Sequence, residues 1–152
     1  MKKQNVWCYA FIALAIILLD RITKSWALTL VQEKIVNPFL SFGLTFNRGI
    51  NWGIFNSSNG TTFIIINIAI AAVILGMLIY TFTCWKHKSP ILGQVLVLAG
   101  ALSNYYDRIM HGGVIDFIVL SAGNLSWPAF NIADAAILLG VGLIAITNYK
   151  NW

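Results

Sequence analysis

The sequence contains few charged residues for its length. Only 10% of its 152 residues are Asp, Glu, Lys or Arg, whereas 59% are hydrophobic and the mean hydropathy is +0.77. A soluble domain carries about 25% charged residues, which cover its water-facing surface. This scarcity argues against a soluble domain and favours an integral membrane protein. The basic residues are scattered, so no cluster resembles a nucleic-acid binding surface, and we expect no nucleic-acid partner.

Residues that form disulfides or bind metals are also scarce. Cys8 and Cys84 stand singly at the ends of apolar segments, and the only histidines are His87 and His111. Structural zinc takes about four nitrogen or sulfur ligands, and no such set converges in the sequence. We therefore expect no metal and no cofactor, and we interpret both cysteines as small apolar residues.

Long apolar stretches are abundant instead. A helix needs about 20 residues to cross a hydrocarbon core of roughly 30 Å. Four segments reach this length, at about residues 6–30, 62–85, 91–110 and 131–149. We predict a single membrane-embedded domain over residues 1–152, an α-helical integral membrane protein with four transmembrane helices. The basic, apolar start also resembles a cleaved signal peptide, but no small-x-small cleavage site follows it.

The distribution of basic residues predicts the orientation of these spans. With four spans, the loop at about 31–61 lies on the side of the membrane opposite the termini. Its only basic residues are Lys34 and Arg48. Cytoplasmic segments carry the excess of Lys and Arg. We therefore expect both termini in the cytoplasm and the loops at about 31–61 and 111–130 outside. Five lysines lie on the cytoplasmic side in this arrangement: Lys2, Lys3, Lys86, Lys88 and Lys150.

Two segments of the outer loops have strand character. The stretch "FLSFGLTFN" (39–47) alternates apolar and small or polar residues, and a period of two indicates a strand. The stretch "GVIDFIVL" (113–120) is rich in β-branched residues and flanked by glycine. Because strand backbone cannot lie bare in lipid, we predict a small β-sheet region on the outer face of the membrane.

The few acidic residues are the main functional signal. The chain has five, and all except Glu33 lie in or beside predicted spans, where an ionisable residue is by default a functional candidate. Asp20 precedes Lys24 by four residues, the favourable order for a helical ion pair. Such a pair has a structural alternative, which is simply to make two charges tolerable inside the first span.

The third span presents a polar face. Gly100, Asn104 and Arg108 recur every four residues, and Asp107 lies at the outer end of the same span. Glycine permits close helix packing and asparagine forms interhelical hydrogen bonds, so packing alone could explain this face. Arg108 could instead hold a carboxylate or a lipid phosphate.

Asp116 and Asp134 flank the same short outer loop. Each has a bland interpretation: Asp116 could accept backbone N–H bonds in a turn, and Asp134 could complete a helix cap begun by Asn131. Two carboxylates in contact share a proton, because both cannot easily ionise. The ionised member can then deprotonate a water while the other protonates a carbonyl, as in aspartic proteases. Either aspartate could be the ionised member, although a helix N-terminus favours charge on Asp134.

Four motifs resemble those of a known family. They are "DRITK" (20–24), "NRGINWGIF" (from Asn47), "AGALSNYYDRIMHGGVIDF" (99–117) and "FNIADAAI" (130–137). In this order, over essentially the whole length, they resemble the bacterial lipoprotein signal peptidases, also called signal peptidase II. The pattern departs from the family's usual glycines at Ala99 and Ser103, and from its usual outer-loop residues at Asn51 and Trp52.

The resemblance implies a membrane aspartic endopeptidase of the bacterial inner membrane. Such enzymes remove the signal peptide from diacylglyceryl-modified prolipoproteins, and globomycin-type cyclic peptides inhibit them. The expected partners are therefore a lipidated prolipoprotein and membrane lipid, and the implied catalytic residues are Asp116 and Asp134. Seven further residues match positions that bind substrate or support the site: Asp20, Lys24, Asn47, Gly100, Asn104, Arg108 and Asn131.

Two other classes of function remain open from the residues alone. A small proton-coupled transporter also uses membrane carboxylates, but the acids here gather toward the outer side and no inverted repeat is visible. A non-catalytic lipid-binding protein would use Asp134 as a helix cap and the Asp20–Lys24 pair as a helix lock. Removing the carboxylates of such a protein would change stability rather than proteolysis.

Overall fold

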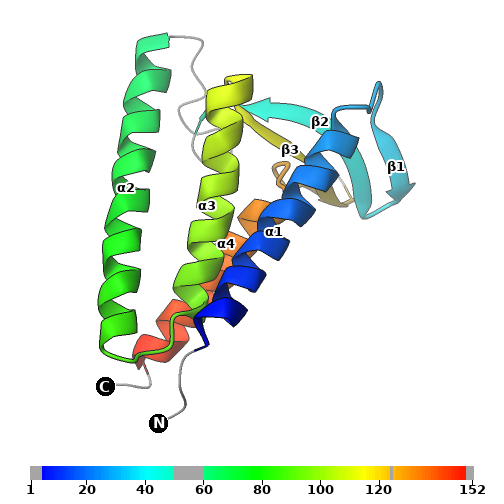
Figure 1. Ribbon diagram of the computed structural model, residues 1–152. Helices are drawn as coiled ribbons and strands as arrows, with labels where there is room; N and C mark the ends of the chain where they lie inside the picture. Colours follow the sequence, from blue (N-terminus) through cyan, green and yellow to red (C-terminus); the bar gives the residue numbers. More distant parts are fainter. Residues whose placement is uncertain (1–4, 50–59, 124, 150–152) are drawn as a thin grey trace.

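The chain forms four helices with a small sheet at one end of them (Figure 1). The computed structural model describes residues 5–49, 60–123 and 125–149. In Figure 1, α1 begins and α4 ends at the end of the helices far from the sheet, where the connection from α2 to α3 also lies. In chain order the elements are α1 (Val6–Ala27), β1 (Lys34–Asn37), β2 (Leu40–Asn47), α2 (Gly60–Lys86), α3 (Leu92–His111), β3 (Val114–Ala122), β4 (Leu125–Ser126) and α4 (Ile132–Tyr149).

Each predicted span contains one helix. The largest difference is at the end of the first, because α1 stops at Ala27 and the N–H groups of Thr29 and Leu30 turn back to the carbonyls of Trp26 and Ala27. Of the described helices, α1 and α2 are long and apolar enough to cross a membrane, while the apolar part of α4 is shorter. Large apolar side chains such as Trp7, which is 84% exposed, face outward, as expected of a surface in lipid rather than water.

Helices α3 and α4 approach each other closely because glycines line their contact. A Cβ atom at Gly93 would lie 2.8 Å from the carbonyl oxygen of Gly140, and one at Gly140 would lie 2.6 Å from the oxygen of Gly93. A Cβ atom at Gly100 would collide with the carbonyl of Ala133. Small residues allow such close backbone contact, so the close packing predicted for Gly100 is confirmed.

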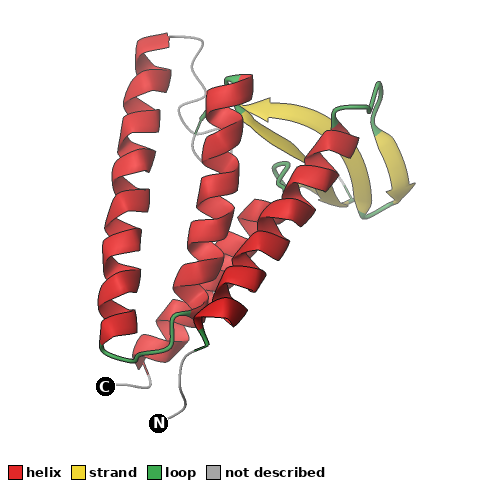
Figure 2. Ribbon diagram, in the orientation of Figure 1, coloured by secondary structure: helices red, strands yellow, loops and turns green. Residues whose placement is uncertain are grey.

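The sheet, drawn in yellow in Figure 2, is antiparallel, and its strand order is β1-β2-β3-β4. The two predicted strands correspond to β2 and β3, which pair from Leu40 opposite Leu120 to Asn47 opposite Val114. The short outer strands β1 and β4 were not predicted. The sheet packs on the end of α1, where Trp26 meets Phe42 edge to face at 5.2 Å. The sheet and the ends of the helices thus form one junction, and the acidic residues meet there.

Candidate active site

The first turn of α4 carries a reciprocal cap. The Oδ1 atom of Asn131 accepts the backbone N–H of Asp134 at 2.9 Å, and the Oδ2 atom of Asp134 accepts the backbone N–H of Asn131 at 3.2 Å. This is a capping box in which aspartate takes the place of glutamate or glutamine, and it satisfies two N–H groups that have no partner within the helix. The cap predicted from the sequence is confirmed, and it fixes the carboxylate of Asp134 at the start of α4.

The same asparagine also binds Asp116. The side-chain amide of Asn131 donates to Oδ1 of Asp116 at 2.7 Å and to the carbonyl of Ile115 at 3.2 Å. Asn131 is fully buried and Asp116 is 1% exposed. One residue therefore binds both carboxylates, Asp134 through its backbone and Asp116 through its side chain. The structure brings Asp116 and Asp134 together, as their positions around one outer loop predicted.

Two more asparagines complete the surroundings of these carboxylates. Asn47 donates from its side-chain amide to Asp116 at 3.1 Å, and Asn104 donates in the same way to Asp134 at 2.8 Å. The interhelical hydrogen bonding predicted for Asn104 is therefore confirmed. The alternative in which Asp116 accepts backbone N–H bonds in a turn is wrong, because its hydrogen bonds in the described structure come from side-chain amides. Neutral amides hold both acids in place without neutralising them.

The environment of Asp116 favours its protonated form. Burial raises the pKa of Asp116, the negative charge of Asp134 raises it further, and the result is about 7. The amides of Asn47 and Asn131 and the positive charge of Lys24 act in the opposite direction on this pKa. Near neutral pH, Asp116 can therefore carry a proton beside Asp134, as one member of an acid–base pair does.

A second group of charges lies beside this pair. The ammonium of Lys24 is 2.8 Å from Asp20 and 2.7 Å from Asp107, and the guanidinium of Arg21 is 2.5 Å from Asp107 and 3.1 Å from Asp20. We call Asp20, Arg21, Lys24 and Asp107 the ion cluster. Its two positive and two negative side chains balance in charge. Balance matters because the side chains of both acids are fully buried, and an unpaired buried charge is strongly destabilising.

The ion cluster confirms one prediction and adds residues that were missed. The predicted Asp20–Lys24 helical pair is present. Arg21 and Asp107 were not selected as site residues. Asp107 had a signal in the sequence, because it lies three residues after Asn104 and therefore shares the buried face of its helix.

The ion cluster accepts hydrogen bonds from the backbone N–H groups of the residues that precede Asp116 and Asp134. Asp20 accepts the N–H of Ala133 at 3.0 Å, next to Asp134. Asp107 accepts the N–H of Ile115 at 3.3 Å, next to Asp116. In addition, Lys24 donates to the side-chain oxygen of Asn104 at 2.7 Å. The cluster thus connects α1 and α3 to both segments that carry the aspartate pair.

Arg108 lies nearby but has other hydrogen-bond partners. Its guanidinium donates to the backbone carbonyls of Arg48, at 3.4 Å, and Gly49. Of the two roles left open for Arg108, holding a carboxylate or a lipid phosphate, a direct hydrogen bond to a carboxylate is absent from the described contacts. Its position ties the end of β2, where Asn47 lies, to α3. The positive charge of Arg108 still interacts through space with Asp116 and Asp134.

One departure from the family pattern takes part in this network. The hydroxyl of Ser103 donates to Asp20 at 2.6 Å, a hydrogen bond that glycine could not make. Ala99, the other departure in this motif, is buried on α3. Asn51 and Trp52 lie outside the described residues.

The aspartate pair supports acid–base chemistry. Among residues 5–49, 60–123 and 125–149, no three His, Cys, Asp or Glu side chains are grouped to hold a metal ion. Asp116 and Asp134, by contrast, are both held by Asn131 and differ in their other partners, an arrangement that can separate an acid from a base.

Comparison with known proteins identifies the family. A family model described as signal peptidase (SPase) II matches residues 12–150, most of the chain. The chain belongs to the signal peptidase II family. Lipoprotein signal peptidases of Polynucleobacter necessarius and Thermodesulfovibrio yellowstonii are 37% and 41% identical to it, over 95% and 89% of this chain and 90% of each relative.

A solved structure supports both the fold and the membrane character. A bacterial membrane enzyme determined by the in meso method at 2.3 Å resolution is 34% identical, with a TM-score of 0.76 over 99% of this chain and 92% of that one. The resemblance stated from the four motifs is confirmed. This signal peptidase II family member is therefore a peptidase and a membrane protein.

Proposed function

We propose that this peptidase removes the signal peptide from lipidated prolipoproteins with a water activated between Asp116 and Asp134. The curated relatives named above are lipoprotein signal peptidases, which supports the class of substrate. The observation that carries the proposal is the binding of both carboxylates by Asn131, since it places two acids at one buried point at the edge of the helices.

The surroundings of the two acids assign their roles in this proposal. Asp116, with a pKa of about 7, holds the shared proton near neutral pH and is the acid. Asp134 lies in the first turn of α4 and accepts an N–H group from Asn131 and another from Asn104, and these two hydrogen bonds hold it in position to act as the base.

Hydrolysis then proceeds in two balanced steps. In the first, Asp134 takes a proton from the water as the oxygen attacks the scissile carbonyl, and Asp116 gives its proton to the carbonyl oxygen. In the second, the C–N bond of the tetrahedral intermediate breaks, Asp134 passes its proton to the leaving nitrogen, and Asp116 recovers a proton from a hydroxyl of the intermediate. The starting protonation state is restored.

The supporting residues act by holding these groups still. Asn47, Asn104 and Asn131 orient the carboxylates through the hydrogen bonds described above. Asp20 and Lys24, with the rest of the ion cluster, fix the neighbouring backbone and Asn104. Gly100 allows α3 to approach the first turn of α4, and Arg108 anchors the end of β2. Positioning of this kind is worth large factors in rate, because small displacements of catalytic groups are costly.

The proposal places all four helices across the bacterial inner membrane. Both termini lie in the cytoplasm and the aspartate pair lies toward the outer face. In support, the sheet is at the end of the helices opposite the start of α1 and the end of α4 (Figure 1), and Lys86 and Lys88, in the connection from α2 to α3, are at that other end. The scissile segment reaches the aspartate pair in an extended form, since a helix engages its carbonyls in internal hydrogen bonds.

The proposed position in the membrane also indicates where lipid and inhibitors bind. The lipidated precursor enters sideways from the outer leaflet, and the exposed apolar side chains of α1, such as Phe11 and Ile22, contact lipid. Globomycin-type cyclic peptides compete with the precursor for the region of the aspartate pair.

Asparagine substitutions test the proposal. Asp116→Asn and Asp134→Asn keep the size and most hydrogen-bonding capacity of each side chain but remove the acid. Each should lower cleavage of a purified diacylglyceryl-modified precursor by about 1,000-fold, within the range for loss of acid–base catalysis. Thermal unfolding of each variant serves as the folding control. Near-normal turnover by both variants would exclude the mechanism, and normal turnover with lowered stability would favour a purely structural role.

A further inference from the structure

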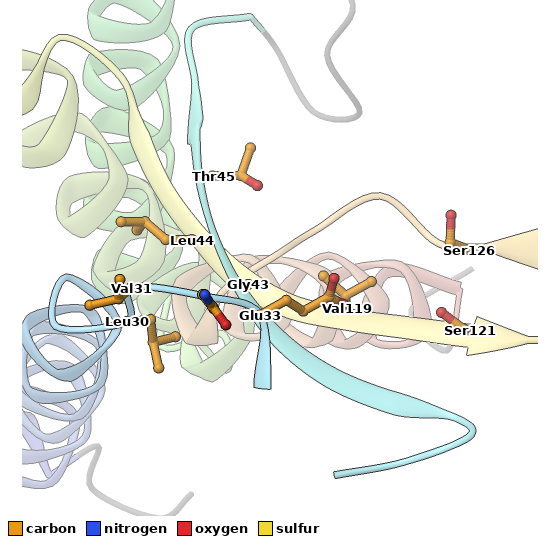
Figure 3. A pocket seen from close by; sticks show the side chains of 10 residues that line it. Leu30, Val31, Glu33, Gly43, Leu44, Thr45, Val119, Ser121 and Ser126 are labelled. Carbon is orange, nitrogen blue, oxygen red and sulfur yellow. The ribbon is translucent and has the colours of Figure 1, made fainter. Parts of the chain in front are cut away.

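A pocket of about 560 Å³ lies between the sheet and the segment that leaves α1. Figure 3 shows side chains around it from both strands of the β2–β3 pair and from residues 30–33. Its volume is within the range of ligand sites, roughly 300–1,000 Å³. The lining includes Glu33 and the hydroxyl groups of Thr45, Ser121 and Ser126.

One end of the pocket lies on the neighbouring strand directly opposite Asp116. Thr45, which lines the pocket, is the cross-strand partner of Asp116. Directly opposite residues on neighbouring strands are close together, so Thr45 brings one end of the pocket within one strand spacing of Asp116. Val119 and Ser121 lie an odd number of positions from Asp116, so the pocket extends from Thr45 along the face of β3 opposite the Asp116 side chain, toward Ser121 and Ser126.

Glu33 gives the pocket a fixed negative charge. The chain has five acidic residues, and the other four belong to the aspartate pair or to the ion cluster. The carboxylate of Glu33 accepts a hydrogen bond from the hydroxyl of Ser41, and its side chain passes beside Gly43, where no side chain intervenes. A carboxylate that is held in place and not paired with a cation in the described contacts attracts a cationic or N–H-rich group.

The polar lining distinguishes this pocket from an acyl-chain site. A second cavity, of about 330 Å³, lies between α1 and α2 and is lined mainly by apolar side chains such as Leu78, Phe82 and Trp85. Hydrocarbon is stabilised in surroundings of that kind, whereas hydroxyl and carboxylate groups are better satisfied by a peptide. The chemistry of the sheet pocket therefore fits polypeptide.

We propose that this pocket binds the first residues of the mature lipoprotein, after the lipidated cysteine, and that Glu33 favours lysine or arginine there. The inference rests on the proposed function. If the signal segment lies among the helices and the scissile bond at the aspartate pair, the polypeptide beyond that bond leaves over the sheet. The pocket lies on that route, starting at Thr45.

Precursors that differ only after the cysteine test this assignment. Three lipidated precursors carry lysine, glutamine or aspartate at the second to fourth mature positions and are otherwise identical. The wild-type enzyme should show a KM for the lysine precursor about three- to fivefold below that for the glutamine precursor, the factor expected of one exposed ion pair. Glu33→Gln should remove the difference, and Glu33→Lys should make the aspartate precursor the best substrate, with little change in kcat.

Lys34→Gln is the matched control, because it changes one charge at the neighbouring position, at the start of β1 opposite Phe42. It should retain the wild-type order of the three precursors. An unchanged order in Glu33→Lys, or no discrimination by the wild-type enzyme, would overturn the assignment. Failure of the aspartate mechanism is distinguishable, because it appears as cleavage of all three precursors by Asp116→Asn, whatever the mature sequence.

Discussion

Helices α2 and α3 are neighbours of opposite character. α2 has 27 residues, and its buried residues are Ile66 and Ile74 alone among those described. α3 has 20 residues, and its buried face includes Ser103, Asp107 and Arg108. In Figure 1, α2 stands on one side of α3, while α1 and α4 lie on the other. The more apolar helix is therefore peripheral to the site, and the helix with the polar buried face is central to it.

This difference separates two kinds of sequence signal. An apolar run such as α2 indicates a helix long and apolar enough to cross a membrane, where lipid accepts many exposed hydrophobic side chains. A buried face with several polar residues, such as that of α3, indicates specific partners on other elements, since burial without partners is unfavourable. Substitutions on the two helices should therefore have very different consequences, and matched pairs of variants measure this difference.

Among these matched pairs, the largest effect on cleavage is expected for the asparagine that binds both carboxylates. Asn131→Ala removes the amide bond to Asp116 and the cap of α4, and cleavage should fall by about 100-fold, the scale expected when catalytic groups are displaced. Asn67→Ala is the matched change on α2, where Asn67 bonds only to its own helix at Phe63 among the described contacts. Steady-state cleavage of one lipidated precursor measures both. Equal losses would refute the contrast between the two regions.

In the ion cluster, the expected effect is on stability rather than on cleavage. Lys24→Met leaves Asp20 and Asp107 with one cation instead of two, and removing one partner of a buried ion pair costs about 3–5 kcal/mol. Lys86→Met in the last turn of α2 removes an exposed charge and should cost well under about 1 kcal/mol. Denaturant unfolding in one detergent compares the two. A Lys24→Met variant as stable as Lys86→Met would show that the cluster does not support the fold.

The smallest contrast concerns one methyl group at a helix contact. Gly100→Ala places a Cβ atom against the carbonyl of Ala133 and the side chain of Ile137, and overpacking of this kind costs about 1–3 kcal/mol. Gly76→Ala on α2 meets no atom within 4 Å and should be neutral or slightly stabilising, since alanine favours helix over glycine. Thermal unfolding of both variants measures the difference. Loss of stability in Gly76→Ala but not in Gly100→Ala would show that close packing at α2, rather than at α3, stabilises the protein.

The sequence was sufficient for elements whose signal is local. Apolar length predicted the four helices, alternation predicted β2, and the Asn131-to-Asp134 spacing predicted the cap. The short strands β1 and β4 were missed because four and two residues are too few to show a period. They are strands because longer neighbours offer them hydrogen-bond partners.

On α3, the site residues were predicted only where they recur at a regular interval in the sequence. Gly100, Asn104 and Arg108 were selected at intervals of four, but a helix has 3.6 residues per turn. Its buried face therefore also includes positions at intervals of three, here Ser103 and Asp107. Arg21 was missed for a different reason: its partner Asp107 is 86 residues away, and no local pattern connects them.

The dependence of cleavage on pH tests the central claim, that Asp116 and Asp134 share one catalytic proton. Because the pKa of Asp116 is about 7, kcat/KM should fall with loss of a single proton as the pH rises above about 7. Asn47 donates to Asp116 and stabilises its charged form, so Asn47→Ala should move this decline to higher pH. A rate that stays constant well above pH 7, or a decline that Asn47→Ala leaves in place, would contradict the shared proton.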